Sequence, residues 1–150
     1  MMKIGFVGLG NVGGKLAGSL LRNNIDLYVR DLNADLVEKF TNIGAKTCIN
    51  NRELMETCDA VITCLPSPAA SASVMEDKDG LLEGMSSGKI WMEMSTTDQN
   101  EVKRLGKLIY EKSDPQLIAL FLVGVIVQIL VTLLFLLVVK ERYLIEFCHC

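Results

Sequence analysis

The chain has 150 residues, with 15 lysines and arginines against 18 aspartates and glutamates, and a net charge of −3 at pH 7. Half of the residues are hydrophobic, which is enough to build a core and excludes a disordered or fibrous chain. The slightly acidic balance excludes a nucleic-acid-binding protein that relies on bulk positive charge. The hydrophobicity is uneven, because residues 1–112 resemble a soluble α/β protein in composition whereas residues 117–139 are almost wholly apolar.

Short apolar runs alternate with segments of helical periodicity along residues 1–112. The apolar runs predict buried strands at 3–7, 26–29, 46–49, 60–65 and 89–94. Apolar residues three or four positions apart predict helices at 11–22, 33–40, 51–55, 68–75 and 97–111. Asn33 and Asn51 are the expected N-caps of two of these helices, and Gly44 is expected to follow the end of the second. Alternating strands and helices predict a doubly wound, parallel α/β sheet of the Rossmann type, left incomplete after the fifth strand.

A glycine-rich turn stands between the first strand and the first helix, with the sequence Gly8-Leu9-Gly10-Asn11-Val12-Gly13. In a G-x-G-x-x-G turn, the first glycine permits the tight turn, the second lets a pyrophosphate approach the backbone, and the third allows close helix packing. The helix N-terminus then offers N–H groups and a partial positive charge to the phosphates. The alternative is a glycine turn that serves packing alone.

An acidic residue follows the second strand at the position that a dinucleotide-binding turn requires. Asp31 is suited to accept hydrogen bonds from the ribose hydroxyls of the cofactor and to repel a 2′-phosphate. Asp31 therefore favours NAD over NADP. The preference is slight, because the neighbouring Arg30 is able to offset the charge of a 2′-phosphate.

Three stretches, at 3–21, 64–70 and 92–97, resemble the β-hydroxyacid dehydrogenase family, which includes 3-hydroxyisobutyrate dehydrogenase and 6-phosphogluconate dehydrogenase. They read KIGFVGLGNVGGKLAGSLL, CLPSPAA and MEMSTT, and the resemblance covers residues 2–112, the N-terminal part of the family's chain. It implies a Rossmann domain that binds NAD or NADP in an oxidoreductase acting on a small hydroxy-carboxylate. The parent enzyme is expected to be cytoplasmic.

The resemblance also implies where the ligands lie. The segment Leu65-Pro66 is expected to run along the cofactor, and Ser95-Thr96 to lie near the nicotinamide and the substrate carboxylate. Both segments follow strands at their carboxyl ends, where open α/β sheets bind ligands. For Ser95-Thr96-Thr97, the alternative is a helix cap, which is compatible with the ligand role. The expected cofactor contacts are Gly8, Leu9, Gly10, Asn11, Val12, Gly13, Asp31, Leu65, Pro66 and Thr96.

The chain departs from the family after residue 112. The family continues with a D-x-P-V-S-G-G motif and a helical second domain whose lysine serves as the catalytic acid or base. No lysine here matches that motif, and Lys103, Lys107 and Lys112 have the spacing of a solvated helix face. No catalytic residue is therefore assigned, and the chain alone is not expected to transfer hydride.

Residues 117–139 are long and apolar enough to predict a transmembrane helix, with a buried core helix as the alternative. A second functional hypothesis follows, in which a non-catalytic nucleotide-binding module is anchored to a membrane by this single span. The chain has five cysteines, and this odd number and the lack of a secretory signal argue against disulfides. Cys48, Cys58 and Cys64 are therefore expected to be free, and they are expected to be buried because they lie in or beside apolar runs. Cys148-His149-Cys150 is either a metal cluster or, since adjacent ligands enclose an ion poorly, an unstructured end. No metal site is predicted.

A third interpretation of residues 113–150 comes from the genetic code. If each codon's last base is read with the first two bases of the next, codons for residues 117–124 can be chosen to spell D-C-P-V-S-G-G. This is the family's next motif at the place where it is expected. We therefore hypothesise a one-base frameshift near codon 112 or 113, which would truncate a longer enzyme and create an accidental apolar run.

Overall fold

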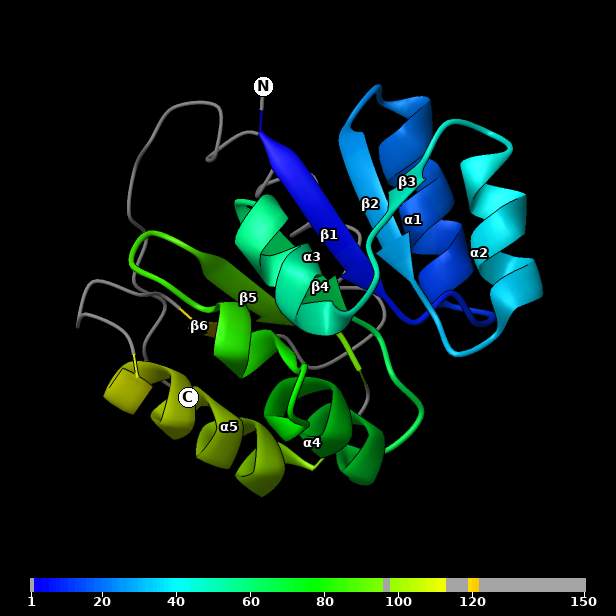
Figure 1. The fold of residues 1–150 in the computed structure, drawn as a ribbon. Coiled ribbons are helices and arrows are strands. Elements are labelled where there is room, and N and C mark those ends of the chain that lie inside the picture. The colour runs from blue at the N-terminus through cyan, green and yellow to red at the C-terminus, as the bar shows by residue number, and fades with distance from the viewer. Residues whose placement is uncertain (1, 96–97, 113–118, 122–150) are drawn as a thin grey trace.

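The structure is a computed structural model that describes residues 2–95, 98–112 and 119–121. Its strands form one six-stranded sheet in the order β3-β2-β1-β4-β5-β6, and every neighbouring pair is parallel (Figure 1). The strands are β1 (Lys3–Val7), β2 (Asp26–Arg30), β3 (Lys46–Thr47), β4 (Ala60–Thr63), β5 (Ile90–Glu93) and β6 (Ala119–Phe121). The helices are α1 (Gly13–Arg22), α2 (Ala34–Thr41), α3 (Asn51–Thr57), α4 (Pro68–Glu76), the 3₁₀ helix η1 (Leu81–Gly84) and α5 (Gln99–Lys112). The predicted Rossmann-type topology is confirmed.

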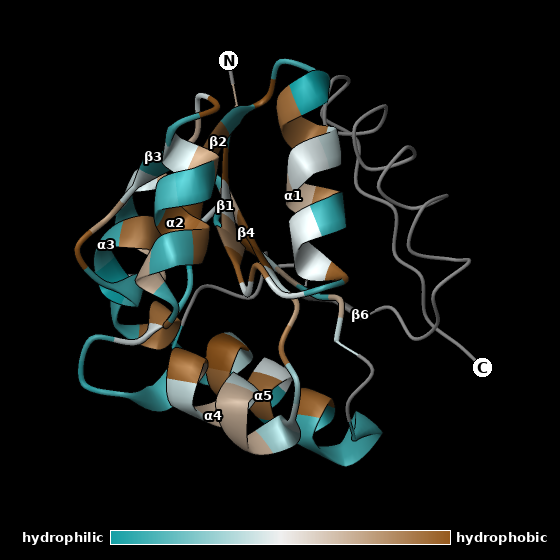
Figure 2. Ribbon diagram, turned by 90° about the vertical axis from the view of Figure 1, so that its right-hand side faces the viewer, coloured by the Kyte–Doolittle hydropathy of each residue, from teal (hydrophilic) through white to brown (hydrophobic). Residues whose placement is uncertain are grey.

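The central strands are buried because helices cover both faces of the sheet. All four residues of β4 are buried, as are all but the first of β1, which explains why these strands are apolar runs without alternation. One hydrophobic cluster joins the sheet to α1 and α2, and the other joins it to α3, α4, η1 and α5. Figure 2 shows the sheet nearly edge-on between α1 and α3. Trp91 on β5 is fully buried in the second cluster and donates its indole N–H to Oγ1 of Thr63 on β4 (2.9 Å).

The helices begin at polar caps, one of which differs from the prediction. Asn33 caps α2 as predicted, since its side chain accepts a hydrogen bond from the N–H of Asp35. The N-cap of α3 is Asn50, whose Oδ1 accepts from the N–H of Glu53 (2.8 Å), so the prediction of Asn51 was wrong by one residue. Two consecutive asparagines offer the same capping chemistry, and only the backbone path selects between them.

Three predicted strands end earlier than expected. The strand predicted at 89–94 ends one residue early, at Glu93, and those predicted at 46–49 and 60–65 end two residues early. β3 stops at Thr47, and the carbonyls of Cys48 and Ile49 instead accept hydrogen bonds from the guanidinium of Arg30. β4 stops at Thr63, and the N–H of Leu65 donates to a side chain. Past β4, the N–H of Cys64 still donates to the carbonyl oxygen of Val7 on β1, and only Leu65 turns to a side chain. Periodicity does not reveal these long-range side-chain contacts.

The structure corrects two predictions about the region beyond residue 112. Residues 119–121 fall within the predicted apolar helix 117–139, yet they form β6, which pairs with β5 from Trp91↔Ala119 to Glu93↔Phe121. The sheet therefore has the sixth strand that was expected to be missing, since β6 supplies partners to the backbone of β5. Residues 117–118 and 122–139 lie outside the described part of the chain. Within that part, no helix combines the length and hydrophobicity needed to cross a bilayer.

Candidate cofactor-binding site

The three glycines of the turn between β1 and α1 differ in what surrounds them. Gly8 has a φ of +97°, and a Cβ there would lie 2.2 Å from the carbonyl oxygen of Cys64. A Cβ on Gly13 would lie 1.9 Å from the carbonyl oxygen of Gly8. Both glycines are thus required by the protein's own backbone. A Cβ on Gly10 would meet nothing within 4 Å, so the space above this residue is open to a ligand.

The N-terminus of α1 opens onto the same space. Gly10, Asn11 and Val12 are exposed, whereas Leu9 is buried beneath them. No side chain caps this helix, and no acidic residue lies in its first turn. The first turn of α1 therefore carries no acidic side chain of its own that would compete with a phosphate for its backbone N–H groups and its positive dipole end.

Asp31 lies directly after β2 and is held against the glycine turn. Its Oδ2 accepts a hydrogen bond from the N–H of Leu9 (2.6 Å), and its Oδ1 accepts from the N–H of Asn33 (2.8 Å). A carboxylate has about four acceptor positions, so two remain for the hydroxyls of a ribose. The carboxylate is thus oriented by the backbone beside the space above Gly10.

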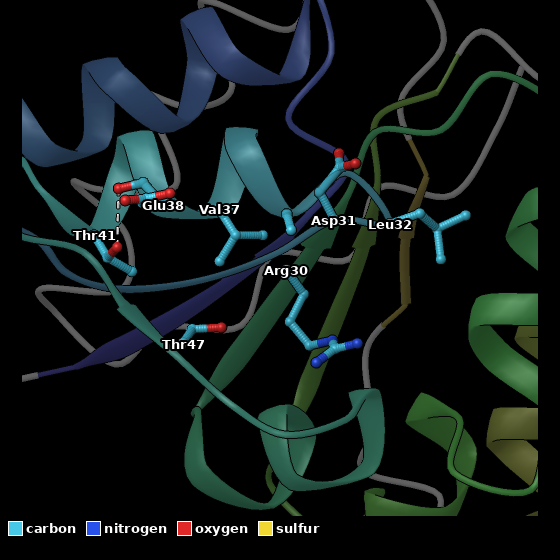
Figure 3. Close-up of a pocket in the computed structure, with 8 residues that line it drawn as sticks. Arg30, Asp31, Leu32, Val37, Glu38, Thr41 and Thr47 are labelled. Atoms are coloured by element: carbon cyan, nitrogen blue, oxygen red, sulfur yellow. Dashed lines mark hydrogen bonds between the residues drawn. The ribbon is translucent and has the colours of Figure 1, made fainter.

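Arg30 precedes Asp31 but is directed elsewhere. Its Nη1 donates to the carbonyl oxygens of Cys48 (2.8 Å) and Ile49 (2.5 Å). Figure 3 shows the side chains of Arg30 and Asp31 extending in opposite directions from the end of β2. A cavity of about 400 Å³ lies here between α2 and β3, and it is lined by Arg30, Asp31, Leu32, Ala34, Val37, Glu38, Thr41 and Thr47. Leu32, next to the carboxylate, is fully exposed.

The second half of the sheet contributes the segments after β4 and β5. Leu65 is half-buried and Pro66 is exposed. The N–H of Leu65 donates to Oγ of Ser95 (2.7 Å), and the N–H of Ser95 donates to Oε1 of Glu93 (2.8 Å). The Ser95 hydroxyl also donates to the same Glu93 oxygen. The sequence interpretation missed Glu93, although an acidic residue within the apolar run IWMEM was the signal that could have found it.

The remaining predicted groups are placed as follows. Thr96 and Thr97 lie outside the described residues, as do Cys148, His149 and Cys150. Cys48, Cys58 and Cys64 are free, as predicted, but only Cys58 is fully buried, and burial raises the pKa of its thiol to about 12. Burial also raises the pKa of the Cys64 thiol, with a further contribution from the charge of Glu93. Among residues 2–95, 98–112 and 119–121, no cluster of histidine, cysteine and acidic side chains is able to hold a metal ion.

A parallel sheet of order 3-2-1-4-5-6, an open glycine turn at a helix N-terminus and an acidic residue after the second strand together define a dinucleotide-binding domain of the Rossmann class. The family model described as the NAD binding domain of 6-phosphogluconate dehydrogenase matches residues 3–119. The chain belongs to this family, which confirms the resemblance to the β-hydroxyacid dehydrogenases.

Individual relatives agree over the same part of the chain. It is 31% identical over 111 residues to 2-(hydroxymethyl)glutarate dehydrogenase of Eubacterium barkeri, covering 74% of this chain and 37% of the relative. It is equally 31% identical over 110 residues to the human cytokine-like nuclear factor N-PAC, covering 73% and 20% of the two chains. The crystal structure of 3-hydroxyisobutyrate dehydrogenase from Salmonella typhimurium superposes with a TM-score of 0.68 at 25% identity, covering 75% of this chain and 39% of that one. The chain thus spans well under half the length of these proteins.

Proposed function

We propose that the chain binds NAD as the cofactor-binding part of a dehydrogenase that acts on a small β-hydroxy acid. The observation that carries this proposal is the open space above Gly10, between two glycines that the protein's own packing requires. Bound NAD supplies a nicotinamide ring that accepts a hydride from the hydroxyl-bearing carbon of the substrate. The family to which the chain belongs supports the choice of a nicotinamide dinucleotide.

The residues divide between the two halves of the cofactor. Asn11 and Val12, which directly precede α1, are proposed to bind the pyrophosphate through their backbone N–H groups. Leu9, whose N–H donates to Asp31, is proposed to contact the cofactor as part of the same turn. Asp31 is proposed to accept the ribose hydroxyls of the adenosine half. In the second half-sheet, Leu65 and Pro66 are proposed to lie along the nicotinamide half, as Rossmann domains divide the dinucleotide between their two half-sheets. Thr96 is proposed to contact both the nicotinamide and the substrate carboxylate.

The environment of Asp31 supports NAD over NADP. A 2′-phosphate would bring two negative charges next to the Asp31 carboxylate, and Glu38 lines the adjoining cavity. Arg30 directly precedes Asp31, yet its guanidinium is already held by two carbonyl oxygens. Like charges about 4–6 Å apart near a protein surface repel by about 3–4 kcal/mol before screening by salt. A screened repulsion of about 1.4–2.8 kcal/mol corresponds to an NAD preference of roughly 10- to 100-fold.

Calorimetric titration of the full chain with NAD and NADP tests this proposal. We expect NAD to bind more tightly, and we expect Asp31→Asn combined with Leu32→Arg to raise the affinity for NADP at least tenfold relative to NAD, since it replaces an anion and adds an exposed cation. Asp35→Asn is the matched control, because it removes the same charge from the exposed first turn of α2. Failure of the folded chain to bind either dinucleotide would overturn the proposal, and equal affinities would overturn its NAD preference.

A second candidate function is a non-catalytic nucleotide-binding module. It is favoured by the 31% identity to a protein named as a nuclear factor, a level equal to that of the dehydrogenase relative. Because this chain alone is not expected to transfer hydride, turnover is measured on the longer protein encoded when the alternate frame is restored after codon 112. NAD reduction by that protein in the presence of a small β-hydroxy acid indicates the enzyme, and binding without turnover indicates the module. Anchoring of such a module by a helix over residues 117–139 is not proposed, because residues 119–121 pair with β5 as strand β6.

We also propose that residues 113–150 are translated out of frame, so that the catalytic part of the parent enzyme is encoded but not read. The ordered agreement of the alternate frame with the motif D-x-P-V-S-G-G supports this idea, because the protein sequence fixes the middle bases of the codons. Sequencing the gene across codons 105–150 gives a direct test. Codons that do not spell the motif in the alternate frame exclude the frameshift.

A further inference from the structure

A chain of buried hydrogen bonds connects the carboxyl ends of β5 and β4. Glu93, the last residue of β5, is 2% exposed, and Ser95 is 4% exposed. Oε1 of Glu93 accepts from both the N–H and the hydroxyl of Ser95, and Oγ of Ser95 accepts from the N–H of Leu65. The regular ladder ends just before, where the N–H of Met94 donates to the carbonyl oxygen of Thr63 (2.8 Å). Side chains thus continue the connection where the backbone ladder stops.

Stability alone does not explain this chain of bonds. A buried carboxylate loses several kcal/mol of hydration, and a well-packed apolar side chain is often at least as stabilising at such a site. Moreover, Oε2 of Glu93 has no hydrogen-bond partner among the described residues, so the carboxylate recovers only part of its hydration. The residues before it, Trp91 and Met92, are buried and apolar. The Glu93 side chain therefore holds a neighbouring backbone segment in a fixed position rather than filling the core.

The geometry that it fixes is that of the segment after β4. The Leu65 side chain packs against the glycine turn, with its Cδ2 3.2 Å from the position of a Cβ on Gly8. The preceding carbonyl, that of Cys64, lies 2.2 Å from the same position. A displacement of Leu65 would therefore alter the wall of the site beside the phosphate-binding turn. The hydrogen-bond chain holds this wall from the β5 side.

We propose that Glu93 is a positioning residue, which acts through Ser95 to fix the Leu65–Pro66 segment against the nicotinamide half of the dinucleotide. This inference rests on the proposed function and makes it more specific. The Ser95 hydroxyl donates its hydrogen bond to Glu93 and accepts from the N–H of Leu65, so it has no donor left for a substrate carboxylate. Ser95 accordingly shapes the cofactor site through the Leu65 backbone, in place of the substrate contact that the family resemblance implies.

The test compares two ligands on the full chain. NAD contacts both halves of the site, whereas ADP-ribose lacks the nicotinamide and reports on the adenosine half and the pyrophosphate. We expect Ser95→Ala to weaken NAD binding about tenfold in calorimetry, the effect of losing a hydrogen bond to a charged group, and to weaken ADP-ribose binding clearly less, because that ligand lacks the nicotinamide. Glu93→Gln retains an acceptor oxygen, so its effect is expected to be smaller than that of Glu93→Leu. Combining Ser95→Ala with Glu93→Leu is expected to add little, because both act through one bonded chain.

Ser71→Ala is the matched control. Ser71 on α4 is 1% exposed and its hydroxyl has no partner in the described part of the chain, so its removal is expected to change neither affinity. Equal weakening of NAD and ADP-ribose by Ser95→Ala would show a structural role only and overturn the inference. If wild-type protein binds neither ligand, it is the proposed function that fails.

A measurement on the wild-type protein covers the case in which the variants do not fold. The Leu65 amide is expected to exchange with deuterium as slowly as the amide of Cys64, whose N–H donates to the carbonyl oxygen of Val7 (2.9 Å). Rapid exchange of Leu65 in the ligand-free protein would mean that Ser95 does not hold it, and would also overturn the inference.

Discussion

Replacing each of two glycines in the same turn by alanine is expected to separate folding from binding. A Cβ at position 13 lies about 1.1 Å inside the 3.0 Å limit that real Cβ contacts observe, and the obstacle is the backbone oxygen of Gly8 rather than a flexible side chain. Overpacking of this kind costs typically 1–3 kcal/mol or more, and the gain of replacing glycine in a helix returns at most about 1 kcal/mol. Gly13→Ala should therefore lower the free energy of unfolding by about 2 kcal/mol.

The same methyl group at position 10 has the opposite pattern of effects. Nothing lies within 4 Å of it and the backbone of Gly10 is outside the left-handed region, so the free energy of unfolding should change by no more than about 0.5 kcal/mol. The methyl group, however, occupies the space proposed for the pyrophosphate. Loss of that close approach should weaken NAD binding at least tenfold, or about 1.4 kcal/mol.

Urea denaturation and calorimetric titration of the full-length variants measure the two quantities. Gly18→Ala serves as the control for helix propensity, because its Cβ meets only the flexible end of Arg22 at 3.4 Å. Wild-type affinity for NAD in Gly10→Ala would refute the assignment of the open space to the pyrophosphate. Wild-type stability in Gly13→Ala would refute the steric argument.

Two further predictions concern stability. Asn50→Ala should lower the free energy of unfolding by about 1 kcal/mol, because the α3 cap is lost. Asn51→Ala is the control and should have a smaller effect in the same urea denaturation experiment. Equal losses of stability in the two variants would count against Asn50 as the cap. The pKa of the Cys58 thiol is about 12 in the folded chain, above its ordinary value of 9.0, so its neutral form stabilises the fold fully below pH 9.0 and progressively less as the pH rises towards 12. Cys58→Ala should therefore reduce the loss of stability measured by urea denaturation between pH 9 and 11, and an unchanged slope would contradict this prediction.

The sequence was most informative where one local rule determined the outcome. The boundaries of β1, the cap at Asn33 and the roles of Gly8 and Gly13 follow from short-range patterns that the structure confirms. The site residues that follow β2 could also be located, because the motif fixes their distance from the glycine turn. Their contacts could not be predicted: the Arg30 guanidinium binds carbonyls at Cys48 and Ile49, which lie 18 and 19 positions away.

Long-range pairing also explains the larger differences. An apolar run such as 117–139 satisfies helix and strand patterns alike, and only the availability of β5 as a neighbour makes residues 119–121 a strand. Glu93 was overlooked for a related reason. Its partner Ser95 is only two residues away, but the bond from the Leu65 N–H to Ser95, which gives the pair its place in the site, forms only when β4 and β5 are side by side. Partners of this kind are set by tertiary structure, which periodicity does not encode.

Trp91 lies where its intrinsic fluorescence reports on the C-terminal half of the sheet. This is the chain's single tryptophan, and its backbone stands in register between Val61 on one side and Ala119 on the other. Its indole is fully buried, two positions before Glu93. Intrinsic fluorescence therefore reports selectively on β4, β5 and β6, without a second fluorophore of the same kind to confuse the signal. Folding and unfolding of this half of the sheet, and ligand entry at the site proposed for the nicotinamide, can be followed in the unlabelled protein.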